Sequence, residues 1–194
     1  MLIVLSLIGL VSGALLMSVN MFTKDRIASN RKKEIEKAVI KVIPGTKSSL
    51  KIYEEKDFTV YKGRDDQGNV LGIAINTAAG GFQDRIFYIF GLDTQLTRIN
   101  SLFVLDQKET PGLGAKIASA EAFLQFWEGR DVKQPLVLRK PAVKKDALAQ
   151  NEVNTVTGAT ISSRAILASV NVALEKIKKL KQEGRFSIEG SDGD

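Results

Sequence analysis

The stretch RIFYIFGLDTQLTRINSLFVL, residues 85–105, decides the fold class of this chain. Residues 85–92 and 99–105 are two runs of aromatic and branched aliphatic residues, and the turn residues 93–95 lie between them. Short runs of this kind, joined by a tight polar connection, are typical of neighbouring antiparallel strands. The stretch therefore predicts two strands of an antiparallel sheet.

Other segments complete the predicted fold. Residues 58–62 and 70–76 are further strand-like runs, with a turn between them. Residues 119–129 and 162–181 repeat apolar residues every three or four positions, which predicts two amphipathic helices. The predicted fold class is α+β: an antiparallel sheet packed with helices, preceded by a single N-terminal transmembrane helix.

The predicted membrane span is residues 2–22, a run of 21 residues without a charge. A helix of this length covers about 30 Å, the thickness of the hydrocarbon core of a bilayer. A cleaved signal peptide is the alternative, but it has a shorter apolar core, a basic start and a small-residue cleavage site. These features fit the segment less well, so we favour an uncleaved anchor in the lipid bilayer.

The chain divides into four predicted parts. They are a transmembrane anchor at residues 1–23, a linking helix at 24–45, an α+β domain at 46–181 and a flexible C-terminal tail at 182–194. The linking helix alternates charged and apolar residues at helical spacing and stops at a Pro-Gly pair. The tail is polar and contains glycine, which favours disorder.

The amino-acid composition excludes several kinds of chemistry. The chain has no cysteine and no histidine. It therefore lacks disulfides, Ser-His-Asp triads, cysteine-bound iron–sulfur clusters, and zinc or haem held by imidazole, and we expect no metal site. The formal net charge is +6, from 28 basic and 22 acidic residues. Basic residues cluster directly after the apolar run, which is typical of contact with lipid headgroups rather than with nucleic acid.

One short motif suggests a hydrolase. Ser48 and Lys51, in the stretch SSLK, have the spacing of a Ser-x-x-Lys pair. We disfavour this reading because the segment is predicted to be a polar loop and no companion motif is present in the sequence.

Two loops contain unusual residues. The first, ETPGLG at residues 109–114, places two glycines where a flat ligand can approach main-chain amides, although this segment alone favours an ordinary strand-to-helix turn fixed by Pro111. The second, NTVTGATISSRA at residues 154–165, precedes a predicted helix. Gly158 and Ala159 leave room beside Thr160, and a helix start favours an anion such as phosphate. A helix capped by Ser162 and Ser163 explains the same residues without a ligand.

Both loops resemble signatures of one family. Residues 157–160, TGAT, resemble the flavinylation motif of bacterial proteins that carry FMN esterified through its phosphate to a threonine. Residues 108–117, KETPGLGAKI, are similar to the second signature of the same FMN-binding domain. Occurring in this order after one transmembrane segment, the two motifs most resemble the G subunits of Rnf ion-translocating electron-transport complexes.

The resemblance implies a covalent FMN on Thr160, attached by a separate flavin transferase. Residues beside the acceptor would be Thr157, Gly158, Ala159 and Ser162, and those bordering the ring or its ribityl chain would be Glu109, Thr110, Gly112, Leu113 and Gly114. One position departs from the family pattern. Asn154 stands six residues before the acceptor, where the family has aspartate, so the charge at this position is lost.

The resemblance also implies a function and a location. The chain would be a membrane-anchored flavoprotein subunit that relays electrons between ferredoxin and NAD during ion translocation, without catalysing a reaction alone. Its partners would be the other membrane and peripheral Rnf subunits, and its flavin domain would lie outside the cytoplasm, although the basic flank favours the opposite orientation. The alternative is a non-redox structural or assembly subunit in which TGAT only caps a helix.

Overall fold

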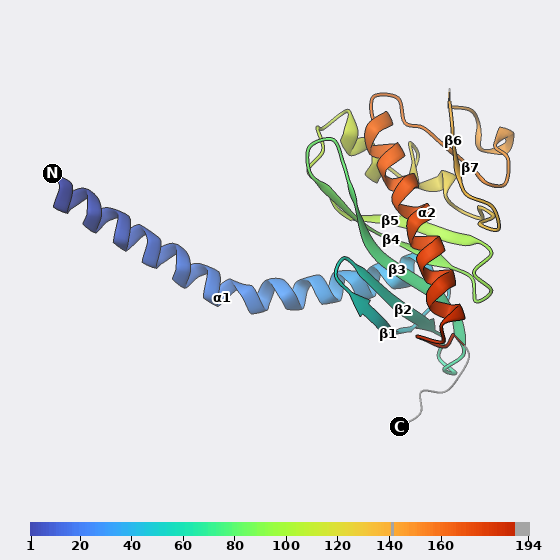
Figure 1. Ribbon diagram of the computed structural model, residues 1–194, viewed down its shortest axis with the longest axis horizontal. Coiled ribbons are helices and arrows are strands. Elements are labelled where there is room, and N and C mark those ends of the chain that lie inside the picture. Colours follow the sequence, from blue (N-terminus) through green and yellow to red (C-terminus); the bar gives the residue numbers. More distant parts are fainter. Residues whose placement is uncertain (141, 189–194) are drawn as a thin grey trace. The chain divides into compact units, whose positions relative to one another are not determined.

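The computed structural model describes residues 1–140 and 142–188, and it divides the chain into two units, residues 1–35 and 36–194. Helix α1, Leu2–Val42, begins in the first unit and ends in the second (Figure 1). Its most apolar window has a mean hydropathy of 2.5, and none of that window is buried. Among the described residues, α1 is the one helix long and apolar enough to cross a membrane.

The second unit is built on a five-stranded sheet. Its strands are β1 Ser48–Glu55, β2 Phe58–Arg64, β3 Val70–Gly80, β4 Arg85–Leu92 and β5 Ile99–Asp106. Each strand pairs antiparallel with the next one along the chain, so the spatial order is β1-β2-β3-β4-β5. The predicted α+β class and the four predicted strands are confirmed.

Strand β1 corrects one prediction, because residues 48–51 begin a strand and do not form a polar loop. β1 is an edge strand, and none of its residues is buried. Its sequence, SSLKIYEE, lacks the concentration of apolar residues from which the other strands were predicted. Lys51 pairs with Glu54 inside this strand, at 2.5 Å between Nζ and Oε2.

Helix α2, Thr160–Gln182, lies across the sheet (Figure 1). Its apolar face, which includes Ile166, Val170 and Ile177, packs into one core with side chains of β2 to β5. The Ser169 hydroxyl donates a hydrogen bond of 3.1 Å to the carbonyl of Ala78 in β3. This packing fixes the start of α2 beside the end of β3, where the candidate site lies.

The predicted helix at residues 119–129 is wrong. The 3₁₀ helix η1, Gly114–Ala118, ends just before this segment, and the segment itself forms turns and one short 3₁₀ helix, η2 Leu124–Phe126. Phe123 and Trp127 are fully buried and pack edge to face at 5.5 Å between ring centroids. The four-residue spacing correctly marked a buried pair, but turns with i→i+5 hydrogen bonds, such as that from Leu124 N–H to the Ser119 carbonyl, replace the helical ladder.

A small parallel sheet, which the sequence did not predict, leads into the second motif. Strands β6 Val137–Arg139 and β7 Glu152–Asn154 pair with each other, and the 3₁₀ helix η3 Lys145–Ala147 lies between them along the chain. Strand β7 ends at Asn154, so the TGAT residues 157–160, which we name the threonine motif, follow a strand after two residues.

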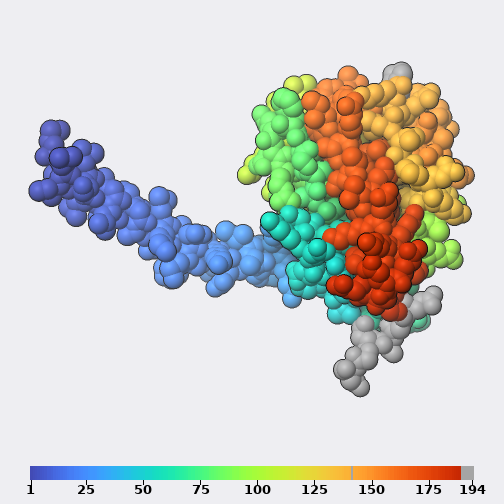
Figure 2. All heavy atoms as spheres, in the orientation of Figure 1, coloured from blue at the N-terminus to red at the C-terminus, as the bar shows by residue number. Residues whose placement is uncertain are grey.

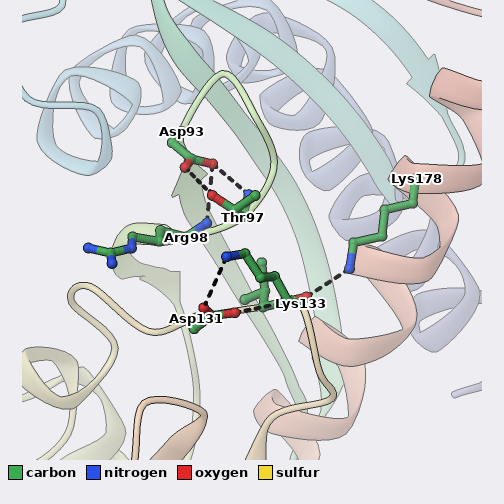
Figure 3. Close-up of polar contacts among 7 residues, drawn as sticks. Asp93, Thr97, Arg98, Asp131, Lys133 and Lys178 are labelled. Atoms are coloured by element: carbon green, nitrogen blue, oxygen red, sulfur yellow. Dashed lines mark hydrogen bonds and ion pairs between the residues drawn. The ribbon is translucent and has the colours of Figure 1, made fainter.

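Polar contacts fix the end of the domain around the β4–β5 turn (Figure 3). The Asp93 carboxylate accepts hydrogen bonds from the Thr97 hydroxyl at 2.6 Å and the Thr97 backbone N–H at 2.7 Å. The Lys178 side chain of α2 donates to the Val132 carbonyl at 2.7 Å. The backbones of Arg98 and Asp131 form an isolated antiparallel β-bridge. These contacts connect the turn, residues 131–133 and α2, so they stabilise the fold.

The predicted flexible tail, residues 182–194, has two different parts. Phe186 and Ile188 are buried and belong to the main core, so residues 183–188 pack against the domain. Residues 189–194 lie outside the described residues.

Candidate functional site

A cavity of about 350 Å³ brings the two sequence motifs together. We name it the threonine cavity, after Thr160 in its wall. Its walls come from the β3–β4 loop, the loop after β5 and the first turn of α2. Figure 2 shows the first turns of α2, in orange, beside the β3–β4 region, in green. The lining residues are Phe82, Glu109, Thr110, Leu113, Gly114, Gly158, Ala159, Thr160, Ile161 and Ser162.

The start of α2 differs from the prediction that serines cap it. The helix begins at Thr160, and the residue at its N-cap, Ala159, makes no side-chain capping hydrogen bond. A turn through Gly158, with φ of 83°, starts the helix before the serines are reached. The capping prediction for Ser162 and Ser163 is therefore wrong.

The two serines make other contacts. The Ser162 hydroxyl donates to the Glu109 carboxylate at 2.7 Å, and the Ser163 hydroxyl donates to the Ala159 carbonyl at 2.8 Å. Since the N-cap residue, Ala159, provides no side-chain acceptor, no capping bond is made to the N–H groups of the first turn of α2. These are the groups that bind anions at helix starts.

Gly158 is the point where the two motifs touch. A Cβ atom on Gly158 would lie 3.0 Å from the Leu113 Cδ2 atom, closer than ordinary van der Waals contact. Glycine also tolerates the positive φ of this position, which other residues adopt at a cost. A larger residue at position 158 would therefore be strained by the positive φ and would have to displace the Leu113 side chain.

Glu109 is the buried acid of the site, with 4% of its surface exposed. Its Oε1 atom accepts a hydrogen bond from the Gln83 backbone N–H at 3.0 Å, and its Oε2 atom accepts from Ser162. Burial would raise the pKa of Glu109, but the Ser162 hydroxyl and the backbone N–H groups of residues 82–84 outweigh it and hold this pKa below its ordinary value. Glu109 is therefore charged at neutral pH.

Two apolar residues of the cavity, Phe82 and Ile161, were not predicted from the sequence. Phe82 is 68% exposed and Ile161 is 55% exposed, and Leu113, which was predicted, is 51% exposed. Three large apolar side chains from three segments, all exposed at one cavity, mark a binding surface. The Gly80-Gly81 pair directly before Phe82, between two predicted strands, was the signal that could have identified this loop.

All but two of the predicted site residues line the threonine cavity. Gly112 lies in the turn of the ETPGLG loop, with φ of 75°, but is not part of the wall. Thr157 is exposed and lines a wider groove of about 800 Å³, together with Lys116, Lys144 and Asn154. We name this second hollow the lysine groove.

Asn154 has a structural partner that explains why an amide fits this position. Its side chain is 1% exposed, and its Oδ1 atom accepts from the Val143 N–H at 3.1 Å while its Nδ2 atom donates to the Val143 carbonyl at 2.5 Å. An aspartate could accept the first bond but would place an oxygen against the carbonyl. Asn154 thus holds the 142–147 segment against β7.

Comparisons with known proteins show which families and chains this chain is similar to. Residues 81–175 match the family model of the FMN-binding domain. The chain is 32% identical over 126 residues to the G subunit of the ion-translocating oxidoreductase complex of Methanosarcina acetivorans, covering 64% of this chain and 60% of that protein. It is 31% identical over 129 residues to the G subunit of the Na(+)-translocating ferredoxin:NAD(+) oxidoreductase complex of Acetobacterium woodii, covering 66% of this chain and 59% of that protein.

The similarity to these two relatives is partial, because the chain spans about 60% of the length of each. The fold also resembles the crystal structure of NqrC from Shewanella oneidensis. The TM-score is 0.54 and the identity is 21%, over 74% of this chain and 73% of that one. This last similarity supports the fold alone.

Proposed function

Because residues 81–175 match the family model of the FMN-binding domain, we propose that the threonine cavity holds FMN joined by a phosphoester bond to Thr160. One observation carries this proposal. The two loops that resemble the family signatures, about 50 residues apart, meet at a single cavity whose wall contains Thr160 at an uncapped helix start.

The residues of the cavity fit the parts of FMN. A volume of about 350 Å³ lies within the range of small-molecule sites. Phe82, Leu113 and Ile161 offer apolar surface to a flat ring. The first-turn amides of α2 and the positive end of its dipole would bind the phosphate next to the Thr160 hydroxyl.

Thr160 acts as a tether in this proposal and not as a catalytic base. A flavin transferase joins the Thr160 Oγ atom to the FMN phosphorus of FAD, the pyrophosphate bond breaks, AMP leaves and the hydroxyl proton is lost. The bound FMN would supply the redox chemistry that a chain without cysteine or histidine lacks. The protein contributes the position of the ring and the electrostatic field around it.

The wider role follows from the relatives. We propose that the chain is the membrane-anchored flavoprotein subunit of an Rnf-type complex, which relays electrons between ferredoxin and NAD during ion translocation. Helix α1 would anchor it in the bilayer, next to the other membrane and peripheral subunits of the complex. The flavin domain would lie on the extracytoplasmic side of the cell membrane.

Flavin fluorescence of the denatured protein tests the proposal. The chain is expressed with a flavin transferase, fully denatured and separated on a gel. We expect fluorescence from the natural chain and none from Thr160→Ala. Fluorescence that survives the substitution would move the attachment elsewhere, and a dark natural chain would favour the structural or assembly subunit.

A labelling experiment tests the location. A cysteine introduced at the exposed residue Lys133 is the only thiol of the chain, because the natural sequence has none. A membrane-impermeant maleimide should label it in intact cells. Labelling only after the cells are opened would place the domain in the cytoplasm.

A further inference from the structure

Glu109 is the one buried carboxylate among the residues that the structure describes. A buried charge is costly unless other groups compensate it, so its position demands an explanation. Among the described residues, no cluster of side chains that could hold a metal ion includes it. The contacts of its side chain point to a different role.

The carboxylate joins all three walls of the threonine cavity. Glu109 itself belongs to the loop after β5, Gln83 donates to it from the β3–β4 loop, and Ser162 donates to it from the first turn of α2. Each carboxylate oxygen therefore accepts a hydrogen bond from a protein donor. Glu109 would act on a bound flavin through the position and the charge of its side chain.

Two glycines make room for this side chain. A Cβ atom on Gly81 would collide with the Glu109 Oε1 atom, and a Cβ atom on Gly114 would lie 2.5 Å from Oε2. The β3–β4 loop and the start of η1 thus close on the carboxylate from two directions. A residue with a Cβ atom at position 81 or 114 would therefore have to displace the Glu109 side chain.

The charge of Glu109 has no cationic partner in the described part of the chain. The groups that contact it are hydroxyl and backbone N–H donors, and no lysine or arginine among residues 1–140 and 142–188 forms an ion pair with it. Hydrogen bonds stabilise the charge but do not cancel it. The wall of the cavity therefore has a net negative charge, shielded from water.

We propose that Glu109 is a positioning residue that holds the three walls together and places a fixed negative charge beside the bound flavin, lowering its midpoint potential. This inference rests on the proposed function. Reduction adds negative charge to the ring, and a nearby anion in a poorly solvated site opposes that addition.

The variant Glu109→Gln tests the charge while keeping the shape. Its carbonyl can accept the Gln83 N–H, and its amide can donate to the Ser162 hydroxyl, which rotates to accept. Glu121→Gln is the matched control, because Glu121 is exposed and lines the neighbouring lysine groove. Each full-length protein is expressed with the flavin transferase, and its midpoint potential is measured by redox titration of the visible flavin spectrum.

We expect Glu109→Gln to shift the midpoint to a more positive potential and Glu121→Gln to leave it near that of the natural chain. An equal shift in both variants, or none in Glu109→Gln, would overturn the role of the charge. If the natural chain has no flavin on Thr160, the proposed function and this inference fail together. If the flavin is present and the Glu109→Gln midpoint is unchanged, this inference alone fails.

Ser162→Ala provides a second test if Glu109→Gln does not fold. Removing the hydroxyl leaves the carboxylate with one donor fewer to disperse its charge. We expect the midpoint to move to a more negative potential, opposite to the effect of Glu109→Gln. A shift to a more positive potential, or no shift, would contradict the proposal.

Discussion

The threonine cavity and the lysine groove share no lining residue, and they differ in size and charge. The cavity has a volume of about 350 Å³ and a buried carboxylate, whereas the groove has a volume of about 800 Å³ and includes Lys116 and Lys144 in its wall. Thr160 lines the first and Thr157 lines the second. Two threonines only three residues apart therefore have different environments, which composition alone cannot distinguish.

The largest expected effect separates these two threonines. We expect Thr157→Ala to keep the full amount of attached flavin, because Thr157 is exposed and outside the cavity, while Thr160→Ala loses all of it. The ratio of flavin absorbance to protein in the denatured chains measures this. A strong loss in Thr157→Ala would show that the groove and the cavity act as one site.

The second prediction concerns the wall of the lysine groove. Asn154→Asp replaces the donor to the Val143 carbonyl with a buried oxygen, so we expect a loss of about 1–3 kcal/mol in the free energy of unfolding. Asn151→Asp is the control, because the Asn151 side chain donates one hydrogen bond, to the Pro135 carbonyl, at a more exposed position. Chemical denaturation compares the two variants, and equal losses would argue against the paired bonds of Asn154.

The third prediction tests the contact between the motifs. Gly158→Ala places a side chain in the left-handed region, which costs about 1–2 kcal/mol, and also pushes against Leu113. Gly129→Ala is matched to it, since Gly129 has φ of 73° but nothing within 4 Å of its Cβ position. We expect only Gly158→Ala to lower the amount of attached flavin. The same flavin content in both variants would contradict a role for the Leu113 contact.

Acid provides the smallest predicted effect. The pKa of Glu109 is lower in the folded chain than in the unfolded chain, so its contribution to stability is complete above the unfolded pKa and is lost as the pH falls through the folded pKa. The natural chain should therefore exceed Glu109→Gln in stability at neutral pH, and the difference should shrink in acid. Urea unfolding at a series of pH values measures this difference in the free energy of unfolding. A difference that stays constant with pH would contradict the statement that Glu109 is charged in the folded chain.

The sheet could be predicted because its buried residues form runs of apolar side chains in the sequence. Strand β4 is an almost continuous run of large apolar residues, and its predicted bounds, 85–92, are those of the structure. Strand β1 was missed because an edge strand without buried residues has no such pattern. The 119–129 segment was mistaken for a helix because turns also bury Phe123 and Trp127 four residues apart.

The site was predictable only in part, for a similar reason. The motif residues were identified by resemblance, but the sequence could not show that Ser162 faces Glu109, because that contact joins residues 53 positions apart. It also could not place Thr157 in the lysine groove and Thr160 in the threonine cavity. Those facts depend on the turn at Gly158 and on the packing of three segments.

The most direct test of the central claim is fragmentation mass spectrometry of one tryptic peptide. Residues 146–164 form a single peptide, which contains Thr155, Thr157 and Thr160. In protein expressed with the flavin transferase, we predict that the mass of the FMN phosphoester lies on fragments that contain Thr160 and is absent from fragments that end before it. An unmodified peptide, or the added mass on Thr157, would contradict the account.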